Sequence, residues 1–211
     1  MNINKVGEYQ INYNVEDSSK NKASITRKVI VKEKQVIKTF NNYSNNKTET
    51  PTYINGILIV NKSYGLPSSY SPGVNSVAYS HPQQLQEAAK QVGFSIPTLS
   101  GYRSYETQRI LYNNYYARDG AIADTYSARP GHSEHQTGLA FDVGAIDDNY
   151  GSTPQGQWLS QNCSEYGFIV RYPKENITGY QYEPWHIRYV GVDIARDITI
   201  RNITLEEYLG V

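Results

Sequence analysis

The segment Ser133-Glu-His-Gln-Thr-Gly-Leu-Ala-Phe-Asp-Val143 sets the interpretation of the whole chain. Its second half alternates as a β-strand does, because successive side chains of a strand point to opposite faces. One face carries Leu139, Phe141 and Val143, and the other carries Gly138, Ala140 and Asp142. Since glycine and alanine are small, we expect open space above the Asp142 carboxylate for a metal ion and a substrate. A half-exposed strand with one solvated aspartate is the alternative for this segment alone.

A second informative segment is Glu183-Pro-Trp-His-Ile-Arg-Tyr189. Glu183 and His186 have opposite parity, so one regular strand does not aim both side chains at a common point. Pro184 lacks the amide donor of a sheet ladder and favours a bend. We therefore expect Glu183 in a turn and His186 in a strand that begins just after it. A core histidine beside an exposed glutamate is the alternative.

Together the two segments offer His135, Asp142 and His186 as metal ligands. Zinc held by protein nitrogen and oxygen ligands with one open position is the hydrolytic arrangement. Such a site also needs a carboxylate outside the ligand set to move the proton of water, and Glu183 is the candidate general base. The His-Glu-x-x-His zinc helix is absent from the sequence, which excludes that class of metalloprotease.

Arg103 is the candidate for stabilising negative charge. It lies in Ser100-Gly-Tyr-Arg-Ser104, at the start of a helix that Ser104 is expected to cap. A guanidinium and the amides of a helix start both favour an anion. We expect Arg103 to act on the oxyanion of a tetrahedral intermediate or on a substrate carboxylate. The alternative is a surface arginine lying over a tyrosine.

Composition limits the partners of the chain. It has 211 residues, with lysine plus arginine and aspartate plus glutamate at 20 each, so the formal net charge is zero. Without a basic field, neither nucleic acid nor an anionic membrane is an expected partner. No apolar run approaches the ~20 residues of a transmembrane helix. The single cysteine, Cys163, excludes a disulfide within the chain, and we expect it to be a buried side chain in a helix over 153–166.

The N-terminal part differs from the rest. Residues 1–35 contain two alternating runs around a polar turn, which predicts a β-hairpin, and residues 36–53 are rich in Asn, Thr, Lys and Ser, which predicts a linker. A lone two-stranded hairpin is marginal in water, so we expect it to dock on another surface. Residues 1–20 are polar and resemble no signal peptide, so we expect the export signal to be absent from these residues.

Residues 54–211 are predicted to form one α+β domain, an antiparallel sheet backed by helices. Hydrophobic periodicity predicts strands over 57–60, 96–99, 139–143, 168–172 and 185–190, and helices over 81–92, 104–117 and 153–166. The helix over 81–92 should bury Leu85, Ala88, Ala89 and Val92 and stop at Gly93. Thr204-Leu-Glu-Glu207 is a capping box that should open a short terminal helix.

These motifs, in this order, resemble the zinc D-Ala-D-Ala carboxypeptidases of the vancomycin-resistance type and the related L,D-carboxypeptidases, which form peptidase family M15B of the LAS group. The resemblance runs from about residue 54 to residue 209. The motifs that carry it are Val60-Asn-Lys-Ser-Tyr-Gly-Leu-Pro67, Ser100-Gly-Tyr-Arg-Ser104, Pro130-Gly-His-Ser-Glu-His-Gln-Thr-Gly138, Gly167-Phe-Ile-Val-Arg-Tyr-Pro173 and Glu183-Pro-Trp-His186. The stretches 6–17 and 27–31 resemble the closing strands of bacterial immunoglobulin-like (Ig-like) surface repeats.

The resemblance implies a Hedgehog/DD-peptidase-like fold and removal of the terminal D-Ala from peptidoglycan stem peptides. It implies zinc on His135, Asp142 and His186, with Glu183 as general base and Arg103 on the transition state. It also implies substrate contacts from Ser133, Gln108 and Tyr172. Such an enzyme is expected outside the cell, at a bacterial cell wall or surface. A preference for pentapeptides (D,D) or tetrapeptides (L,D) stays open, as does the oligomeric state.

Three other functions compete with this one. An endopeptidase of the same group would cut the L-Ala-D-Glu bond and needs an open groove rather than a closed end. A serine-based penicillin-binding enzyme would use the Ser19-x-x-Lys22 pattern, but this lies in the predicted hairpin turn and has no Lys-Thr-Gly partner. A non-catalytic wall-binding module would have no use for a proton shuttle, so the intact Glu183 argues against it.

Overall fold

The computed structural model describes residues 7–31 and 50–211. The chain divides into two compact units, Met1–Thr39 and Phe40–Val211, and each is described by itself. Most of the predicted linker, residues 36–49, lies outside the described residues. Its last residues are not linker, because strand β3 (Thr52–Ile54) begins there and pairs with β4 (Ile57–Ile59).

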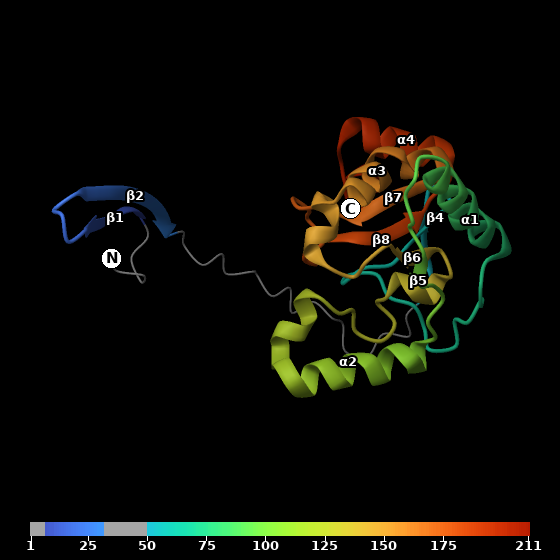
Figure 1. Ribbon diagram of the computed structural model, residues 1–211. Helices are drawn as coiled ribbons and strands as arrows, with labels where there is room; N and C mark the ends of the chain where they lie inside the picture. The colour runs from blue at the N-terminus through green and yellow to red at the C-terminus, as the bar shows by residue number, and fades with distance from the viewer. Residues whose placement is uncertain (1–6, 32–49) are drawn as a thin grey trace. The chain divides into compact units, whose positions relative to one another are not determined.

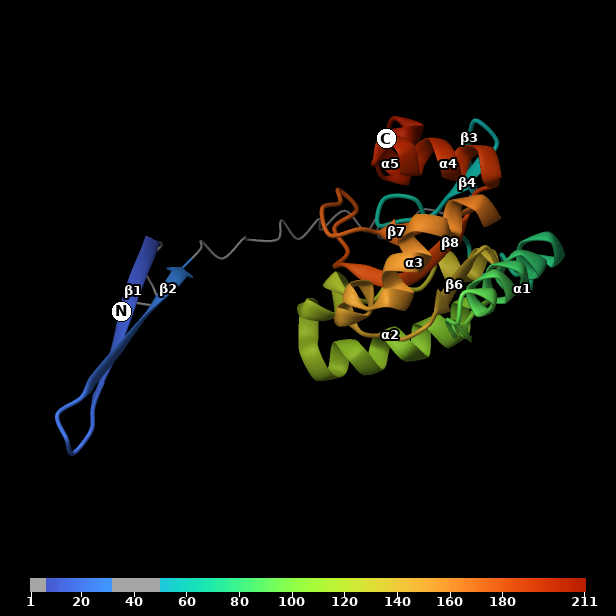
Figure 2. The ribbon, with the colours of Figure 1, turned by 45° about the horizontal axis from the view of Figure 1, so that its top comes forward.

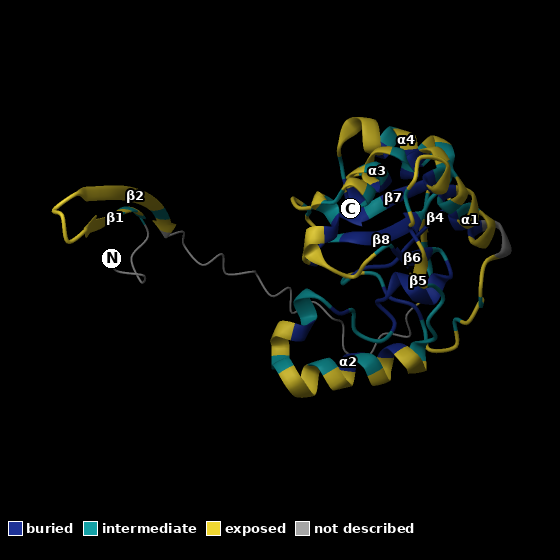
Figure 3. Ribbon diagram, in the orientation of Figure 1, coloured by how far each residue is buried: buried dark blue, intermediate teal, exposed yellow. Residues whose placement is uncertain are grey.

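The first unit contains the predicted hairpin (Figure 1). Strands β1 (Gly7–Glu16) and β2 (Lys22–Val31) pair antiparallel without a register shift. Asp17 closes the turn, since its Oδ1 accepts from the amides of Ser19 and Asn21 at 2.8 and 2.9 Å. Most of the hairpin is exposed, as Figure 3 shows, because two strands offer no second layer to cover their apolar side chains.

The second unit is built on a four-stranded antiparallel sheet (Figure 1). In spatial order its strands are β5 (Thr98–Ser100), β6 (Ala140–Val143), β8 (Glu183–Tyr189) and β7 (Phe168–Tyr172). Each neighbouring pair runs antiparallel. The predicted α+β class, an antiparallel sheet backed by helices, is confirmed.

Five α-helices accompany this sheet in the described part of the second unit. They are α1 (Ser76–Gln91), α2 (Tyr105–Asp119), α3 (Pro154–Asn162), α4 (Val192–Arg201) and α5 (Leu205–Leu209). Ser104 caps α2 through the amide of Thr107, as predicted. The capping box of Thr204 and Glu207 opens α5, also as predicted.

The predicted start and inner face of helix α1 were partly wrong. It begins at Ser76, before the predicted residue 81, and it contains Pro82. Leu85 and Ala89 are fully buried, but Val92 is 55% exposed. The helix ends at Gln91, and Gly93 adopts a left-handed φ of 85°, so Val92 no longer follows the helical face.

Apolar clusters pack on one face of strands β6, β7 and β8, and on the other face at β7. One cluster joins Phe141 and Val143 of β6 and Phe168 of β7 to Leu85 of α1 and Leu159 of α3. A second cluster packs α4 and α5 against strands β4 and β7, and Figure 2 shows these two helices side by side. The apolar face predicted for β6 is therefore confirmed, and it leaves Asp142 on the opposite face.

The predicted helix over 153–166 is an α-helix that tightens into a 3-10 turn at Cys163–Tyr166. Cys163 is buried, as expected, and burial raises the pKa of its thiol to about 12. Such a thiol stays protonated and unreactive at neutral pH. Within residues 7–31 and 50–211, none of the helices combines the length and apolar character that a bilayer crossing requires.

Candidate metal centre

Three separate elements bring the predicted ligands together. His135 lies in the 3-10 turn Glu134–Thr137, Asp142 in β6 and His186 in β8. Asp142 and His186 are direct partners across the two strands, so sheet register alone sets them side by side. One possible ligand atom from each of the three residues lies within 4.8 Å of the others. No other group of three such side chains was found in the described part of the chain.

The geometry also indicates which atoms face the centre. His135 Nε2 lies 3.2 Å from Asp142 Oδ2, and His186 Nδ1 lies 3.3 Å from Asp142 Oδ1. The other nitrogen of His135, Nδ1, is 2.7 Å from the carbonyl oxygen of Gly101. A neutral imidazole that donates from Nδ1 to this carbonyl leaves the Nε2 lone pair for a cation. Two imidazoles and one carboxylate are a donor set that zinc accepts.

Burial and neighbouring charge shift the pKa values of these groups. Burial lowers the pKa of His135, whereas the carboxylates of Asp142 and Glu134 overcome burial and raise the pKa of His186 to about 9. Burial raises the pKa of Asp142, but the two imidazoles outweigh it and hold that pKa well below its usual range. A metal-free centre therefore combines an ionised carboxylate with a protonated His186, and a cation would have to displace that proton.

The Glu183 side chain lies near the candidate ligands, although the alternation of side chains along a strand did not predict how it gets there. It belongs to β8 itself and not to a preceding turn, so the expected position was wrong. The ladder to β7 shifts register, because Val170 pairs with Ile187 and Tyr172 pairs with Glu183. This irregularity re-aims side chains as a bulge does, and Glu183 Oε2 lies 3.6 Å from His186 Nδ1. Burial is the main cause that raises the pKa of Glu183 to about 7.

Arg103 lies beside the Asp142 carboxylate. Its Nη2 is 3.7 Å from Asp142 Oδ2. The guanidinium is fixed by two donated hydrogen bonds, to Gln108 Oε1 at 2.9 Å and to Ser100 Oγ at 3.0 Å. The Arg103 amide also donates to the carbonyl of His135 at 3.1 Å, which ties the arginine loop to the turn that carries the histidine.

The three residues predicted to contact substrate differ in how far other groups of the protein already engage their side chains. Gln108 is buried and fully engaged, since its amide also donates to the Ala128 carbonyl at 2.6 Å. Ser133 directly precedes the 3-10 turn and makes no side-chain capping bond to it. The Tyr172 ring lies against His186, with ring centroids 5.0 Å apart. All eight predicted residues line one cavity of about 150 Å³, namely Arg103, Gln108, Ser133, His135, Asp142, Tyr172, Glu183 and His186.

Space at this site does not arise from Gly138, so one step of the sequence argument was wrong. Gly138 has a φ of 70° and sits at the end of the 3-10 turn. A Cβ at this position would meet the Gly73 carbonyl oxygen at 2.4 Å. The glycine therefore allows two stretches of backbone to pack closely, and it leaves no room above Asp142.

Sequence reasoning missed Glu134, the neighbour of His135. Its side chain is fully buried, and its Oε1 accepts from Arg171 Nε at 2.8 Å and from Arg188 Nη1 at 2.7 Å. Arg171 also donates twice to Glu206 in α5, at 2.8 and 2.5 Å. We call Glu134, Arg171, Arg188 and Glu206 the arginine network. A usable signal was present, because an arginine within each of two apolar strands requires a buried partner.

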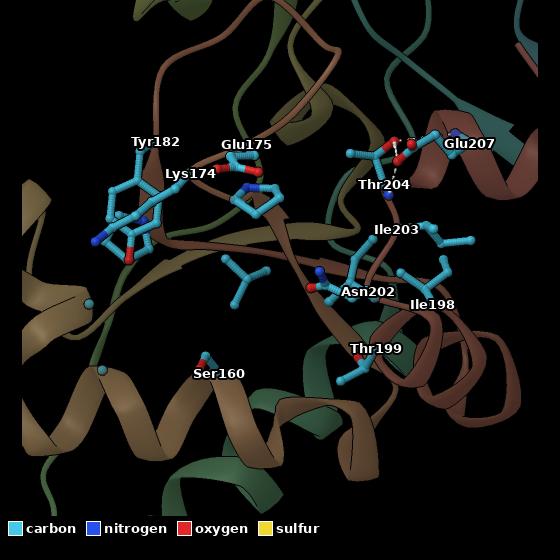
Figure 4. A pocket seen from close by; sticks show the side chains of 16 residues that line it. Ser160, Lys174, Glu175, Tyr182, Ile198, Thr199, Asn202, Ile203, Thr204 and Glu207 are labelled. Atoms are coloured by element: carbon cyan, nitrogen blue, oxygen red, sulfur yellow. Dashed lines mark hydrogen bonds between the residues drawn. The ribbon is translucent and has the colours of Figure 1, made fainter.

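A larger pocket elsewhere in the unit shares no residue with the metal centre. It has a volume of about 440 Å³ and is drawn in Figure 4. Lys174, Glu175 and Tyr182 line one end of it, and Thr204 and Glu207 of the α5 capping box line the other. It contains no histidine, so the smaller cavity is the one that offers metal ligands.

The buried His135, Asp142 and His186 form a candidate metal site, and with the nearby Glu183 they make an arrangement typical of metal-dependent hydrolases. Comparison with known proteins is more specific. The family model of VanY, D-alanyl-D-alanine carboxypeptidase, matches residues 72–192, more than half of the chain. The model of a bacterial surface protein Ig-like domain matches residues 1–31.

Individual relatives agree with the family match. Putative carboxypeptidase YodJ of Bacillus subtilis is 40% identical over 182 residues, which cover 73% of this chain and 67% of that protein. The crystal structure of the L,D-carboxypeptidase DacB from Streptococcus pneumoniae is 46% identical with a TM-score of 0.65, covering 73% of this chain and 86% of that one. The vancomycin-resistance D,D-pentapeptidase VanY, solved as a mutant with Zn(II), is 36% identical with a TM-score of 0.63, covering 72% and 97%.

The chain belongs to the VanY family of D-alanyl-D-alanine carboxypeptidases, and it is a peptidase. The resemblance inferred from its motifs, including the Ig-like fragment at the N-terminus, is confirmed.

Proposed function

We propose that this protein is a zinc-dependent carboxypeptidase that removes the terminal D-alanine of peptidoglycan stem peptides. One observation carries the proposal: candidate ligand atoms of His135, Asp142 and His186 lie within 4.8 Å of one another, in a cavity that Glu183 also lines. The VanY structure with Zn(II) supports the choice of metal, as does the nitrogen and oxygen character of the three ligands.

Zinc held by these three residues would polarise the scissile carbonyl and make water more acidic. Glu183 is then the general base, which takes the proton of the attacking water and delivers it to the leaving amine. Its pKa of about 7, raised by burial, suits a group that must both accept and release a proton near neutral pH. Its position 3.6 Å from His186 Nδ1 keeps it beside the ligands.

Arg103 stabilises the negative charge that develops on the carbonyl oxygen, or binds the terminal carboxylate. Support comes from its place on the cavity wall and from its two fixed hydrogen bonds. Gln108 acts mainly through Arg103, because its oxygen accepts from the guanidinium and its amide donates to Ala128. A donor that is already oriented before the reaction stabilises a transition state without reorganisation.

Ser133 and Tyr172 are proposed to contact the substrate chain. Both line the cavity, and its volume of about 150 Å³ suits the end of a peptide more than an open groove. Pockets for drug-sized ligands are larger, at about 300–1,000 Å³. This favours an exo-acting carboxypeptidase over an endopeptidase that cuts L-Ala-D-Glu within the stem.

Mass spectrometry of synthetic stem peptides tests the proposal. Incubation with pentapeptide and tetrapeptide should release one D-Ala, and a chelator should abolish the release. The relatives include both an L,D-carboxypeptidase and a D,D-pentapeptidase, so the preferred peptide length is read from the same experiment. Release of any fragment other than D-Ala would contradict the proposal. Glu183→Gln should retain zinc and lose turnover, and full activity in that variant would refute its role.

We also propose that the enzyme works outside the cell, at the wall. The Ig-like match at residues 1–31 and the VanY match at residues 72–192 support this arrangement. The proposed peptidase domain comprises residues 54–211 together with the two residues before them, since β3 (Thr52–Ile54) pairs with β4.

A further inference from the structure

Glu134 is placed to act on the metal centre although it is not one of its ligands. It separates Ser133 from His135 in sequence, and its side chain has no exposed surface. Arg171 and Arg188 both donate to Oε1, at 2.8 and 2.7 Å. The carboxylate is therefore held from one side and has little freedom to turn.

The second oxygen of this carboxylate faces a metal-ligating histidine. Glu134 Oε2 lies 3.5 Å from His186 Nε2. Among the described residues, neither atom has a hydrogen-bond partner, and both are buried. Buried polar atoms are nearly always paired, so two such atoms that face each other across a slightly long distance indicate a contact that tightens in the working state.

The orientation of the His186 ring gives this contact a purpose. Its Nδ1 points to Asp142 and Glu183, at 3.3 and 3.6 Å, so Nδ1 is the atom available to a metal. A neutral imidazole that binds metal through Nδ1 must carry its proton on Nε2. That proton then points at Glu134, and metal-bound histidines commonly donate their second ring N–H to a carboxylate in this way.

We propose that Glu134 is a positioning residue of the metal centre: it accepts the Nε2–H of His186 and thereby fixes the ring and its tautomer with Nδ1 toward the metal. This rests on the proposed zinc-dependent function. The other ligand differs, because His135 Nδ1 meets a neutral carbonyl, that of Gly101, at 2.7 Å. The two imidazoles thus have unequal support, because the Glu134 carboxylate faces the ring of His186 and a backbone carbonyl faces the ring of His135.

The arginine network holds Glu134 for this task. Arg171 joins it to Glu206 of α5, and Arg188 also donates to the Leu58 carbonyl at 2.6 Å. Two carboxylates and two guanidiniums compensate one another within the interior, so Glu134 needs no charge from the metal centre.

Zinc affinity in two matched variants tests the role. Glu134→Gln removes the charge that faces His186, and we expect its zinc dissociation constant to rise by about 10–100-fold in a chelator competition assay. Glu206→Gln is the control. It removes a carboxylate charge that pairs with the same Arg171, but residue 206 does not contact a candidate metal ligand. It should lose stability and keep zinc affinity within about twofold, well below the outer-sphere effect. Equal affinity losses in both variants would overturn the proposal.

Nitrogen-15 NMR of the histidines in the zinc-loaded wild type gives a readout that does not depend on variant folding. The chain has four histidines, so assignment is practical. We expect His186 to be protonated at Nε2 and His135 at Nδ1. Protonation of His186 at Nδ1 would overturn the positioning role. Failure of the wild type to bind zinc would instead refute the proposed function, so the two failures are distinguishable.

Discussion

Two buried charged clusters lie next to each other in this protein and differ in how complete they are. In the arginine network, every carboxylate oxygen that meets a guanidinium does so at 2.5 to 2.8 Å. In the metal centre, the imidazoles and the carboxylate stand 3.2 and 3.3 Å apart, and the nearest guanidinium, that of Arg103, is 3.7 Å from Asp142. Figure 3 shows strands β6 and β8, which supply Asp142, His186 and Arg188, as mostly buried.

The difference indicates what each cluster is for. A network whose charges already cancel gains nothing from an added ion, and its cost of burial is met internally. A centre whose two imidazoles and one carboxylate are directed at one point is suited to accept a cation in exchange for a proton. Burial of charged side chains alone therefore does not mark a functional site in this fold. The mark is a set of candidate ligand atoms that face one point.

The largest effect is expected where the incomplete cluster loses a ligand. His135→Ala removes one of the three candidate donors, so zinc affinity should fall by more than the about 10–100-fold typical of outer-sphere changes. Metal content after dialysis and chelator competition measure this. His81→Ala is the control, since His81 bonds Tyr189 at 3.1 Å and lies outside the ligand group. Zinc retention by His135→Ala would contradict the assignment of His135 as a ligand, and with it the difference drawn between the two clusters.

The arginine network, whose charges compensate one another, should respond through stability instead. Arg171→Met leaves Glu134 and Glu206 with buried charge and fewer partners. Breaking such a pair from one side costs about 3–5 kcal/mol. Chemical denaturation of zinc-free protein at neutral pH measures the free energy of unfolding. A change below about 1 kcal/mol, the range of an exposed pair, would show that the network is not charge-compensated as described.

The convergence of the three candidate ligands could be predicted from sequence, because their chemistry restricts the choice. Imidazole and carboxylate donors commonly hold hydrolytic zinc, and the structure brings such donors of His135, Asp142 and His186 within 4.8 Å of one another. The apolar face of β6 was equally predictable, since Phe141 and Val143 alternate with Asp142 and pack into the core.

Other features follow from contacts that local patterns do not contain. The parity rule placed Glu183 in a turn, but the register shift between Val170 and Tyr172 brings it into β8 and toward His186. Glu134 pairs with Arg171 and Arg188, which lie 37 and 54 residues away, so its role depends on how three elements pack. Sequence periodicity describes one strand at a time and is silent on both points.

Glu183 differs from the carboxylates of the arginine network, because its buried charge opposes folding in the absence of metal. Burial raises its pKa from 4.5 to about 7, so the folded state binds more protons than the unfolded state between these values. The free energy of unfolding must then fall as pH rises from 4.5 to about 7, by about 1.4 kcal/mol for each pH unit. Glu183→Gln lacks this loss, so the zinc-free variant should be more stable than wild type, by a few kcal/mol above pH 7.

Denaturation of both zinc-free proteins from pH 4 to pH 8 measures this difference. The two curves should converge at the acid end, where the wild-type carboxyl is protonated in the folded and unfolded states alike. A stability difference that is constant across this range would contradict an uncompensated charge at Glu183.

The smallest effect is expected where an arginine pair is exposed. Arg196 meets Glu165 at 3.0 and 2.5 Å, and the shorter distance equals the shortest one in the arginine network. Their side chains are 48% and 52% exposed, so water solvates both partners when the pair is broken. Arg196→Met should therefore leave the denaturation midpoint nearly unchanged, in contrast to Arg171→Met, which makes the same chemical change. Similar midpoint losses in the two variants would mean that guanidinium geometry, and not the burial of the partner it leaves behind, sets the cost.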